Sequence, residues 1–331
     1  MHELQYLMFT VIVLALLFDF INGFHDSANA IATSVSTRAL RPETAVLLAA
    51  ALEFSGAMIS TGVAKTIGGD IVSSPHIVDE KIIIAALFGA IVWNLVTWWF
   101  AMPSSSSHAL IGGLMGAVLV SVGSTGLNFV GIGKIVISLV ASPVVAWFTG
   151  IVIMNVLFRA FASTNPHTIN NRFRKMQVMT AASMAFSHGS NDAQKSMGII
   201  TLALFSGGFI PEFEVPTYVK VLCASAMSLG VALGGQRIIK TIGGKIFKLE
   251  PMSGFAADLN SSAVVFSATM LTLPVSTTHV VSGSIMGVGT AKRVNAVHWG
   301  VAQQMVAAWV MTIPCTAAMG ALVFALVEAI F

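Results

Sequence analysis

Two aspartates stand inside long apolar stretches, each just after a glycine-containing tripeptide. Asp26 follows Gly23-Phe24-His25, and Asp192 follows Gly189-Ser190-Asn191. An aspartate at the centre of a membrane helix costs about 2.5–3.5 kcal/mol on insertion scales, so we expect bound cations or hydrogen-bond donors to offset that cost. Carboxylate, amide and backbone carbonyl oxygens together suit a hard cation such as Na⁺. The predicted cation-binding residues are Asn22, Asp26, Asn191 and Asp192, with Asn29 beside them.

Glycine is expected to shape these two segments, because Gly23 and Gly189 would let the backbone leave the helix and turn its carbonyl groups toward the site. The alternative to a cation site is a structural hydrogen-bonding pair that stabilises each helix break.

Runs of hydroxyl residues form a second pattern that could bind a ligand. Pro103 precedes four serines and His108, and Pro274 precedes Val275, three hydroxyl residues and His279. A proline ends the preceding segment, so the hydroxyls would lie at the start of the next helix, where free N–H groups and the helix dipole attract anions. Simple helix capping is the alternative. The predicted anion-binding residues are Ser104, Ser105, Ser106, Ser107, Ser276, Thr277 and Thr278.

Other polar residues in apolar surroundings are less informative. Glu53 is an isolated acid, for which a functional role is favoured by default. Lys195 takes the position that Asn29 holds in the first half, so the two halves are not chemically equal. His108 and His279 are as consistent with capping or packing as with function.

The composition places these residues in a membrane protein. Hydrophobic residues make up 56% of the 331 residues and charged residues only 9%, against about 25% in ordinary globular proteins. Residues 82–133 carry no Asp, Glu, Lys or Arg. Such a chain is not a soluble enzyme, and its scattered basic residues do not form a nucleic-acid-binding face. We expect a lipid bilayer around it and no cofactor.

The long apolar runs predict an all-α integral membrane protein rather than a β-barrel. We expect about 10–12 transmembrane helices, some of them broken or re-entrant. The clear spans are 4–24, 45–65, 82–101, 135–158, 217–236, 255–273 and 301–327, and shorter pieces lie at 28–40, 104–123, 178–190, 196–209 and 275–290.

The two halves of the chain resemble each other. Asp26 aligns with Asp192, Thr66 to Gly69 with Thr241 to Gly244, and Pro103 with Pro274, in the same order and at a nearly constant offset. Three such matches are unlikely to arise by chance, even in an apolar chain.

The distribution of basic residues predicts how the two halves are oriented in the membrane. The basic, acid-free segment between the halves should face the cytoplasm, and both termini should be extracytoplasmic. Each half would then cross the membrane an odd number of times. This predicts an inverted repeat with its binding site near the midplane of the bilayer. The predicted units are 1–158, a cytoplasmic connecting loop 159–176, and 177–331, in the plasma or inner membrane.

The motifs resemble those of a known family. Gly23 to Ala30 and Gly189 to Ser196 are similar to the duplicated signature of the inorganic phosphate transporter (PiT) family, as are the two proline–hydroxyl–histidine blocks, and the resemblance covers nearly the whole chain. It implies a cation-coupled phosphate symporter and a homodimer, with two helical hairpins that meet at the substrate. The hydroxyl runs would bind phosphate, and Asn22, Asp26, Asn191 and Asp192 would line the cation and phosphate region. His25 stands where the family usually has Asn, which distinguishes the first cation site from the second. We include His25 and Glu53 as additional candidate site residues.

The favoured function is therefore sodium-coupled import of phosphate by alternating access, with Na⁺ and inorganic phosphate as partners. Alternatives are a proton-coupled phosphate permease, a sulfate permease of the same fold, and a passive anion channel. Enzymatic activity is not expected, because no base–nucleophile pair or metal cluster has an interpretable spacing.

Overall fold

The computed structural model describes residues 2–234 and 236–330, and the regular secondary structure of this part of the chain is helical, apart from one isolated antiparallel bridge between Val72 and Leu127. The predicted all-α class is confirmed. The first half contains α1 (His2–Ser36), α2 (Pro42–Ala57), α3 (Gly62–Asp70), η1 (Pro75–Ile77), α4 (Glu80–Trp99), α5 (Ser106–Ser121), η2 (Ser124–Gly126) and α6 (Phe129–Ala160). The second contains α7 (Pro166–Asp192), α8 (Gln194–Ser206), α9 (Thr217–Leu233), α10 (Gln236–Lys240), η3 (Thr241–Lys245), α11 (Pro251–Met270), α12 (Thr277–Lys292), η4 (Val294–Ala296) and α13 (Trp299–Ile330).

The order of elements in the first half recurs in the second. The bent pair α2–α3 turns by 69°, and α9 with the segment Ile238–Lys245 turns by 71°. Each half then has a hairpin of two helices, α4–α5 and α11–α12, followed by a 32-residue helix with an internal proline, Pro143 in α6 and Pro314 in α13. The offset that aligns the two hydroxyl runs also aligns these two prolines.

Helix packing pairs each half with the other. Helix α13 packs on α5 and α6 on α12, while α1 packs on α9 and α7 on α2. The repeated glycines explain the close approach. A Cβ atom on Gly116 of α5 would lie 1.9 Å from the Ala317 carbonyl oxygen, and one on Gly287 of α12 would lie 2.1 Å from that of Trp147. Small residues that let two helix backbones touch are typical of membrane helix interfaces.

The expected helix breaks at Gly23 and Gly189 are wrong. Helix α1 runs without interruption from His2 to Ser36, and Gly189 lies inside α7. Both glycines serve close packing instead: a Cβ atom on Gly23 would lie 2.2 Å from the Met227 carbonyl oxygen, and one on Gly189 would lie 2.1 Å from that of Glu53. Both aspartates therefore stand on helices, and near Asp192 the helix is interrupted at Ala193, between α7 and α8.

Within the described residues, four helices are long and apolar enough to span a membrane, or up to six if each bent pair counts as one span. The four are Gln5–Ser36, Glu80–Trp99, Phe129–Ala160 and Trp299–Ile330. The predicted number of 10–12 also counted shorter helices and helices with polar faces, such as α7 and α11. Many polar side chains of these two helices, such as those of His188 in α7 and Asp258 in α11, are buried inside the bundle, and polar residues make both helices too polar to be recognised as spans by composition alone.

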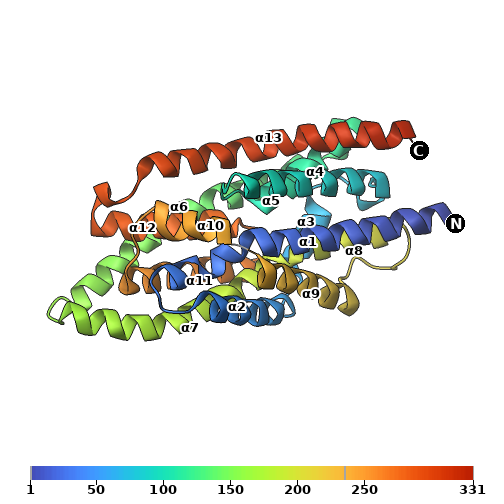
Figure 1. Ribbon diagram of the computed structural model, residues 1–331. Coiled ribbons are helices and arrows are strands. Elements are labelled where there is room, and N and C mark those ends of the chain that lie inside the picture. Colours follow the sequence, from blue (N-terminus) through green and yellow to red (C-terminus); the bar gives the residue numbers. More distant parts are fainter. Residues whose placement is uncertain (1, 235, 331) are drawn as a thin grey trace.

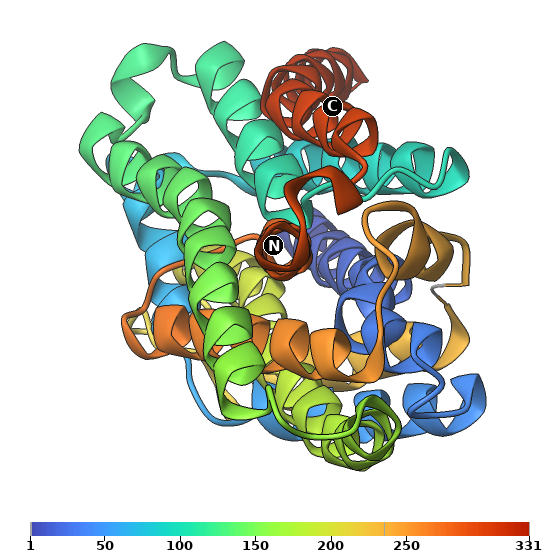
Figure 2. The same ribbon diagram turned by 90° about the vertical axis from the view of Figure 1, so that its left-hand side faces the viewer.

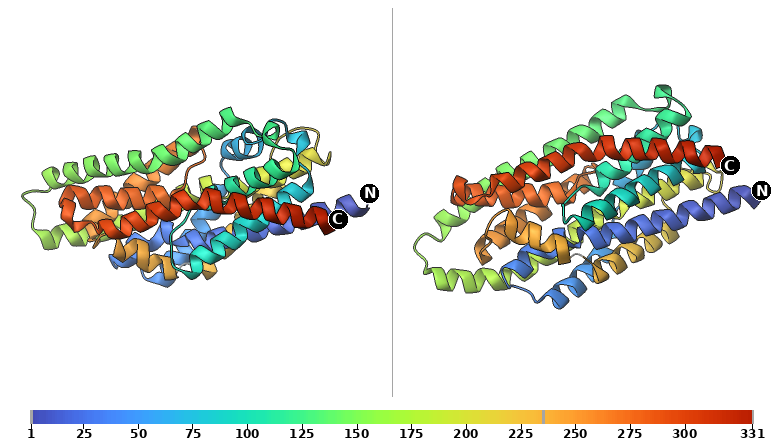
Figure 3. Two further views of the ribbon diagram at one scale, coloured as in Figure 1. Left: turned by 90° about the horizontal axis from the view of Figure 1, so that it is seen from above. Right: turned by 45° about the horizontal axis from the view of Figure 1, so that its top comes forward.

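The two chain ends lie at the same end of the bundle, and the α6–α7 connection lies at the opposite end (Figure 1). Figure 3 shows the same arrangement from two further sides. Each half thus runs from one end of the bundle to the other. Of the predicted connecting segment 159–176, residues 161–165 join the helices and the rest is helical. The unit boundaries and the membrane side of each end stay predictions.

Seen along its length, the bundle places α6 and α13 on the outside (Figure 2). Helix α1 is central, because it contacts helices of both halves, including α4, α7, α8 and α9. Its polar residues between Asp19 and Ser34 are buried as a consequence. The outer helices instead expose apolar side chains, such as Val140 and Val310, which suit contact with lipid.

Candidate functional site

The two hairpins place their tips next to each other in the middle of the bundle. Ser105 caps α5 by accepting a hydrogen bond of 3.2 Å from the His108 backbone N–H, and Ser276 caps α12 by accepting one of 3.3 Å from that of His279. Helix capping, the alternative to anion binding in the sequence analysis, is therefore correct for these two of the seven hydroxyl residues. Both helix N-termini lie beside the buried polar centre, which orients their positive dipole ends toward it.

Each hairpin tip contains a residue in the left-handed region at the same repeat position, with φ of 52° at Ala101 and 58° at Thr272. Each tip is also held by the opposite half of the chain. Ser138 Oγ of α6 donates 3.1 Å to the Pro274 carbonyl oxygen, and Trp309 Nε1 of α13 donates 3.1 Å to that of Pro103. Such strained backbone persists only where its surroundings fix it.

Asp26 lies between the two hairpins. Its Oδ1 is 2.7 Å from His25 Nδ1 and accepts a hydrogen bond of 3.3 Å from Thr278 Oγ1 of the second hairpin. Its Oδ2 accepts one of 3.3 Å from Ser106 Oγ of the first hairpin. The predicted carboxylate thus meets a hydroxyl from each predicted anion-binding run, and His25, predicted as an additional site residue, is in contact with it.

Asp192 holds the equivalent position in the second half. Its Oδ2 accepts hydrogen bonds of 2.7 Å from Lys195 Nζ, 3.4 Å from Asn22 Nδ2 and 3.4 Å from Thr277 Oγ1. Asn22 belongs to α1, so the contact joins the two predicted cation-binding segments directly. Asp192 is fully buried, and Asp26 is 2% exposed.

The remaining predicted residues contribute to the hairpins more than to the carboxylates. Asn191 donates 3.0 Å to Thr269 Oγ1 and accepts 3.4 Å from the Val275 backbone N–H, so it anchors the second tip. Ser104 Oγ donates 2.8 Å to Thr97 Oγ1, which also lies 3.2 Å from His25 Nε2. Ser107 Oγ donates 3.0 Å to the Val275 carbonyl oxygen of the opposite tip.

His188 is the main residue that the sequence did not single out. Its Nδ1 lies 3.1 Å from Glu53 Oε1, and its Nε2 lies 3.6 Å from Asp192 Oδ2, with all three side chains fully buried. Glu53 is therefore part of the same cluster, as its place in an apolar segment suggested. A signal existed, because the offset that aligns Asp26 with Asp192 also aligns Asn22 with His188.

The cluster combines more negative charge than fixed positive charge. Among the described residues, Asp26, Asp192 and Glu53 share this cluster with one ammonium group, that of Lys195, which contacts Asp192. Ligand atoms of Asp26, His188 and Asp192 lie within 4.8 Å of one another, close enough to hold a cation. Asn22 Oδ1, Asn29 Oδ1 and Asp192 Oδ1 are buried and accept no hydrogen bond from the described residues. Oxygens of this type are the ligands that a hard cation prefers.

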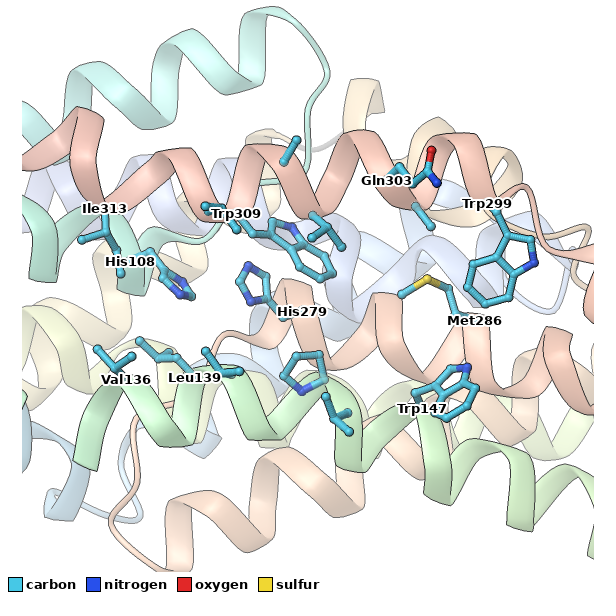
Figure 4. Close-up of a pocket in the computed structure, with 17 residues that line it drawn as sticks. His108, Val136, Leu139, Trp147, His279, Met286, Trp299, Gln303, Trp309 and Ile313 are labelled. Atoms are coloured by element: carbon cyan, nitrogen blue, oxygen red, sulfur yellow. The ribbon is translucent and has the colours of Figure 1, made fainter. Parts of the chain in front are cut away.

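A separate apolar cavity of about 760 Å³ lies behind the hairpins, between α6 and α13 (Figure 4). His108 and His279 lie at its inner side with ring centroids 4.7 Å apart, and His279 stacks on Trp309 at 3.9 Å. These histidines therefore pack between the two halves and make no contact with the carboxylate cluster in the part of the chain that the structure describes. The packing interpretation of the sequence fits their position.

Comparisons with known proteins agree with this architecture. The family model described as "Phosphate transporter family" matches residues 22–320. The chain is 48% identical over 334 residues to the "Probable low-affinity inorganic phosphate transporter" of Bacillus subtilis (strain 168), with 100% of each chain covered. It is 46% identical over 320 residues to a protein of the same description from Rhizobium meliloti (strain 1021), with 96% of each covered.

A solved structure described as "The sodium-dependent phosphate transporter" has the same fold. It matches with a TM-score of 0.92 at 28% identity, covering 98% of this chain and 100% of that chain. The relatives and the shared fold are those of transporters, so the prediction that the protein is not an enzyme is confirmed. The family resemblance noted in the sequence is likewise confirmed, and the chain belongs to the phosphate transporter family.

Proposed function

We propose that the protein imports inorganic phosphate together with sodium by alternating access. The observation that carries the proposal is the meeting of two hydroxyl-lined helix N-termini with the buried carboxylates of Asp26 and Asp192, where Ser106 and Thr278 from opposite hairpins both contact Asp26. The name of the structural relative, a sodium-dependent phosphate transporter, supports sodium as the coupling ion.

Phosphate would bind between the hairpin tips. The positive ends of α5 and α12 attract an anion, and the hydroxyls of Ser104–Ser107 and Ser276–Thr278 supply hydrogen-bond donors. Ser106, Thr277 and Thr278 are the members of this set that face the carboxylates. Phosphate near neutral pH still carries a proton, so it can donate a hydrogen bond to a carboxylate such as Asp26. Sulfate carries none, and the carboxylates therefore favour phosphate.

Sodium would bind beside the phosphate, in the region lined by Asn22, Asp26, Asn191 and Asp192, with His25 and Glu53 as further contributors. A divalent anion cannot enter a buried site with an excess of carboxylates unless cations enter with it, because like charges in a poorly screened interior repel strongly. This requirement is the physical basis of coupling: the anion and the cations each make binding of the other more favourable.

The proposed transport movement follows from the repeat. Residues 1–158 and 177–331 would form antiparallel halves joined on the cytoplasmic side by 159–176, with both termini on the opposite side of the plasma or inner membrane. The protein would work as a homodimer in the bilayer. Because each hairpin tip is held by the outer helix of the opposite half, a rocking of the halves would expose the tips to one side at a time.

Proton coupling is the second candidate, and His188 favours it. An imidazole between the carboxylates of Glu53 and Asp192 is well placed to bind and release a proton during the cycle.

Uptake of labelled phosphate into proteoliposomes distinguishes sodium coupling from proton coupling and from a passive channel. Sodium is replaced by choline at two pH values, and excess sulfate is added as a competitor. We expect uptake that falls when sodium is removed, at both pH values, and that sulfate does not inhibit. Uptake that follows a pH gradient and ignores sodium would establish proton coupling instead. Uptake without any ion gradient dependence would indicate a passive channel.

A further inference from the structure

Lys195 is a lysine buried at the centre of the site, with only 1% of its surface exposed. The offset that aligns Asp26 with Asp192 places it opposite Asn29 of the first half. Both side chains reach the equivalent hydroxyl of the opposite half's hairpin: Asn29 Nδ2 donates 3.4 Å to Thr277 Oγ1, and Lys195 Nζ donates 2.9 Å to Ser106 Oγ, which the offset of the two hydroxyl runs places opposite Thr277. Lys195 therefore makes the same kind of contact that the neutral amide of Asn29 makes in the first half, and it adds a positive charge.

That charge forms its salt bridge with Asp192. Lys195 Nζ lies 2.7 Å from Asp192 Oδ2, whereas Asn29 makes no hydrogen bond to Asp26 among the described residues. The same Asp192 oxygen also receives Asn22 Nδ2 and Thr277 Oγ1 at 3.4 Å. A mobile cation approaching this oxygen would meet three donor groups, one of them an ammonium ion. Within the structure's described ranges Asp26 forms no salt bridge with a lysine or an arginine, and its hydrogen-bond partners are His25 and two hydroxyls.

We propose that the ammonium group of Lys195 permanently takes the place of a coupling cation at Asp192. Mobile cations then serve only the rest of the site, on the side of Asp26. The inference rests on the proposed function and deepens it, since it fixes which of the two repeat-related carboxylates responds to the coupling ion. The halves share one architecture but differ in how charge is balanced: one carboxylate is neutralised by the chain itself, and the other by an ion from solution.

A purely structural role for Lys195 would also explain its burial, but it makes a different prediction. If the ammonium only stabilises the fold, its removal weakens the protein and leaves the number of ions transported unchanged. If the ammonium replaces an ion, its removal opens a site for one more cation per phosphate. The number of charges moved per phosphate therefore separates the two roles.

The test compares Lys195→Asn, which installs the residue of the other repeat, with Lys195→Arg, which keeps the charge. Each protein is reconstituted in proteoliposomes, and the charge moved per phosphate is obtained from the membrane voltage at which phosphate flux reverses under fixed ion gradients. We expect Lys195→Asn to move one more positive charge per phosphate than the wild type and Lys195→Arg to move the same number. An unchanged number in Lys195→Asn would overturn the proposal.

A second variant covers the case in which Lys195→Asn does not insert. The double variant Lys195→Asn/Asp192→Asn removes both members of the buried pair, so no uncompensated charge is left in the interior. We expect it to move the wild-type number of charges. A loss of one positive charge per phosphate in the double variant would mean that Asp192 binds a mobile ion in the wild type, and would overturn the proposal.

The same measurement keeps this inference separate from the proposed function. A wild-type reversal voltage that shifts with pH and not with sodium would contradict sodium coupling. The charge count in the variants would still decide the role of Lys195, because it does not depend on which cation is coupled.

Discussion

Asp26 and Thr278 join the two halves of the chain at the proposed binding site. The hydroxyl of Thr278, at the start of α12, donates a hydrogen bond of 3.3 Å to the Asp26 carboxylate on α1. These residues are separated by 252 positions in the sequence. The contact places the proposed anion-binding helix end of one repeat against the proposed cation-binding carboxylate of the other, so the two ligands of a symporter would bind side by side.

Removing the Thr278 hydroxyl should impair transport. Thr278→Val keeps the shape of the side chain but loses the donor to Asp26 and the acceptor for Asn29. A hydrogen bond to a charged group contributes about 1.5–3 kcal/mol, so we expect phosphate uptake at low substrate to fall about tenfold or more. Thr278→Ser restores the hydroxyl and should restore most of the uptake. Equal uptake by the valine and serine variants would show that the hydroxyl has no role.

The Glu53–His188 pair should be energetically coupled. Both side chains are fully buried, and their closest atoms are 3.1 Å apart. Breaking a buried pair by removing one partner is destabilising by about 3–5 kcal/mol. We therefore expect Glu53→Gln and His188→Gln each to lower the unfolding temperature in detergent. The decrease in the double variant should be smaller than the sum of the decreases in the two single variants. Strict additivity would argue against a direct interaction.

Gly116 should be intolerant of any side chain. A Cβ atom there would lie 1.9 Å from the Ala317 carbonyl oxygen, closer than any real contact, so Gly116→Ala must push α5 away from α13. We expect a clear loss of thermal stability. Gly133 in α6 is the matched control, because a Cβ atom there meets nothing within 4 Å. Gly133→Ala should be neutral or stabilising by about 0.5–1 kcal/mol. Similar melting of the two variants would contradict the packing account.

The sequence predicted the membrane class, the repeat and the residue types of the site, because buried charges are rare in an apolar chain and their duplication is visible. Asp26, Asp192, Ser106, Thr277 and Thr278 do meet in the structure. The expected helix breaks at Gly23 and Gly189 were wrong, because a glycine that lets two helices touch has the same sequence signature as one that bends the backbone. Which hydroxyls cap a helix and which face the carboxylates also depends on the helix start to within one residue.

The role of His188 could not be read from local sequence. Its partner Glu53 stands in the other half of the chain, on α2, and the contact exists only because α2 and α7 pack together. The repeat offset for the aspartate block places His188 opposite Asn22, and this equivalence is recognisable only once Asn22 is known to face a carboxylate. Pairings of this kind are set by tertiary packing.

The most direct test of the account is phosphate uptake driven by an inward sodium gradient in proteoliposomes containing the wild type, Asp26→Asn or Asp192→Asn. Size-exclusion elution and circular dichroism establish that each variant is inserted and folded. We predict sodium-driven uptake by the wild type and background uptake by both variants, because Asp26→Asn removes the carboxylate that balances the coupling ion and Asp192→Asn leaves the buried Lys195 without its partner. Full sodium-dependent uptake by both folded variants would contradict the account.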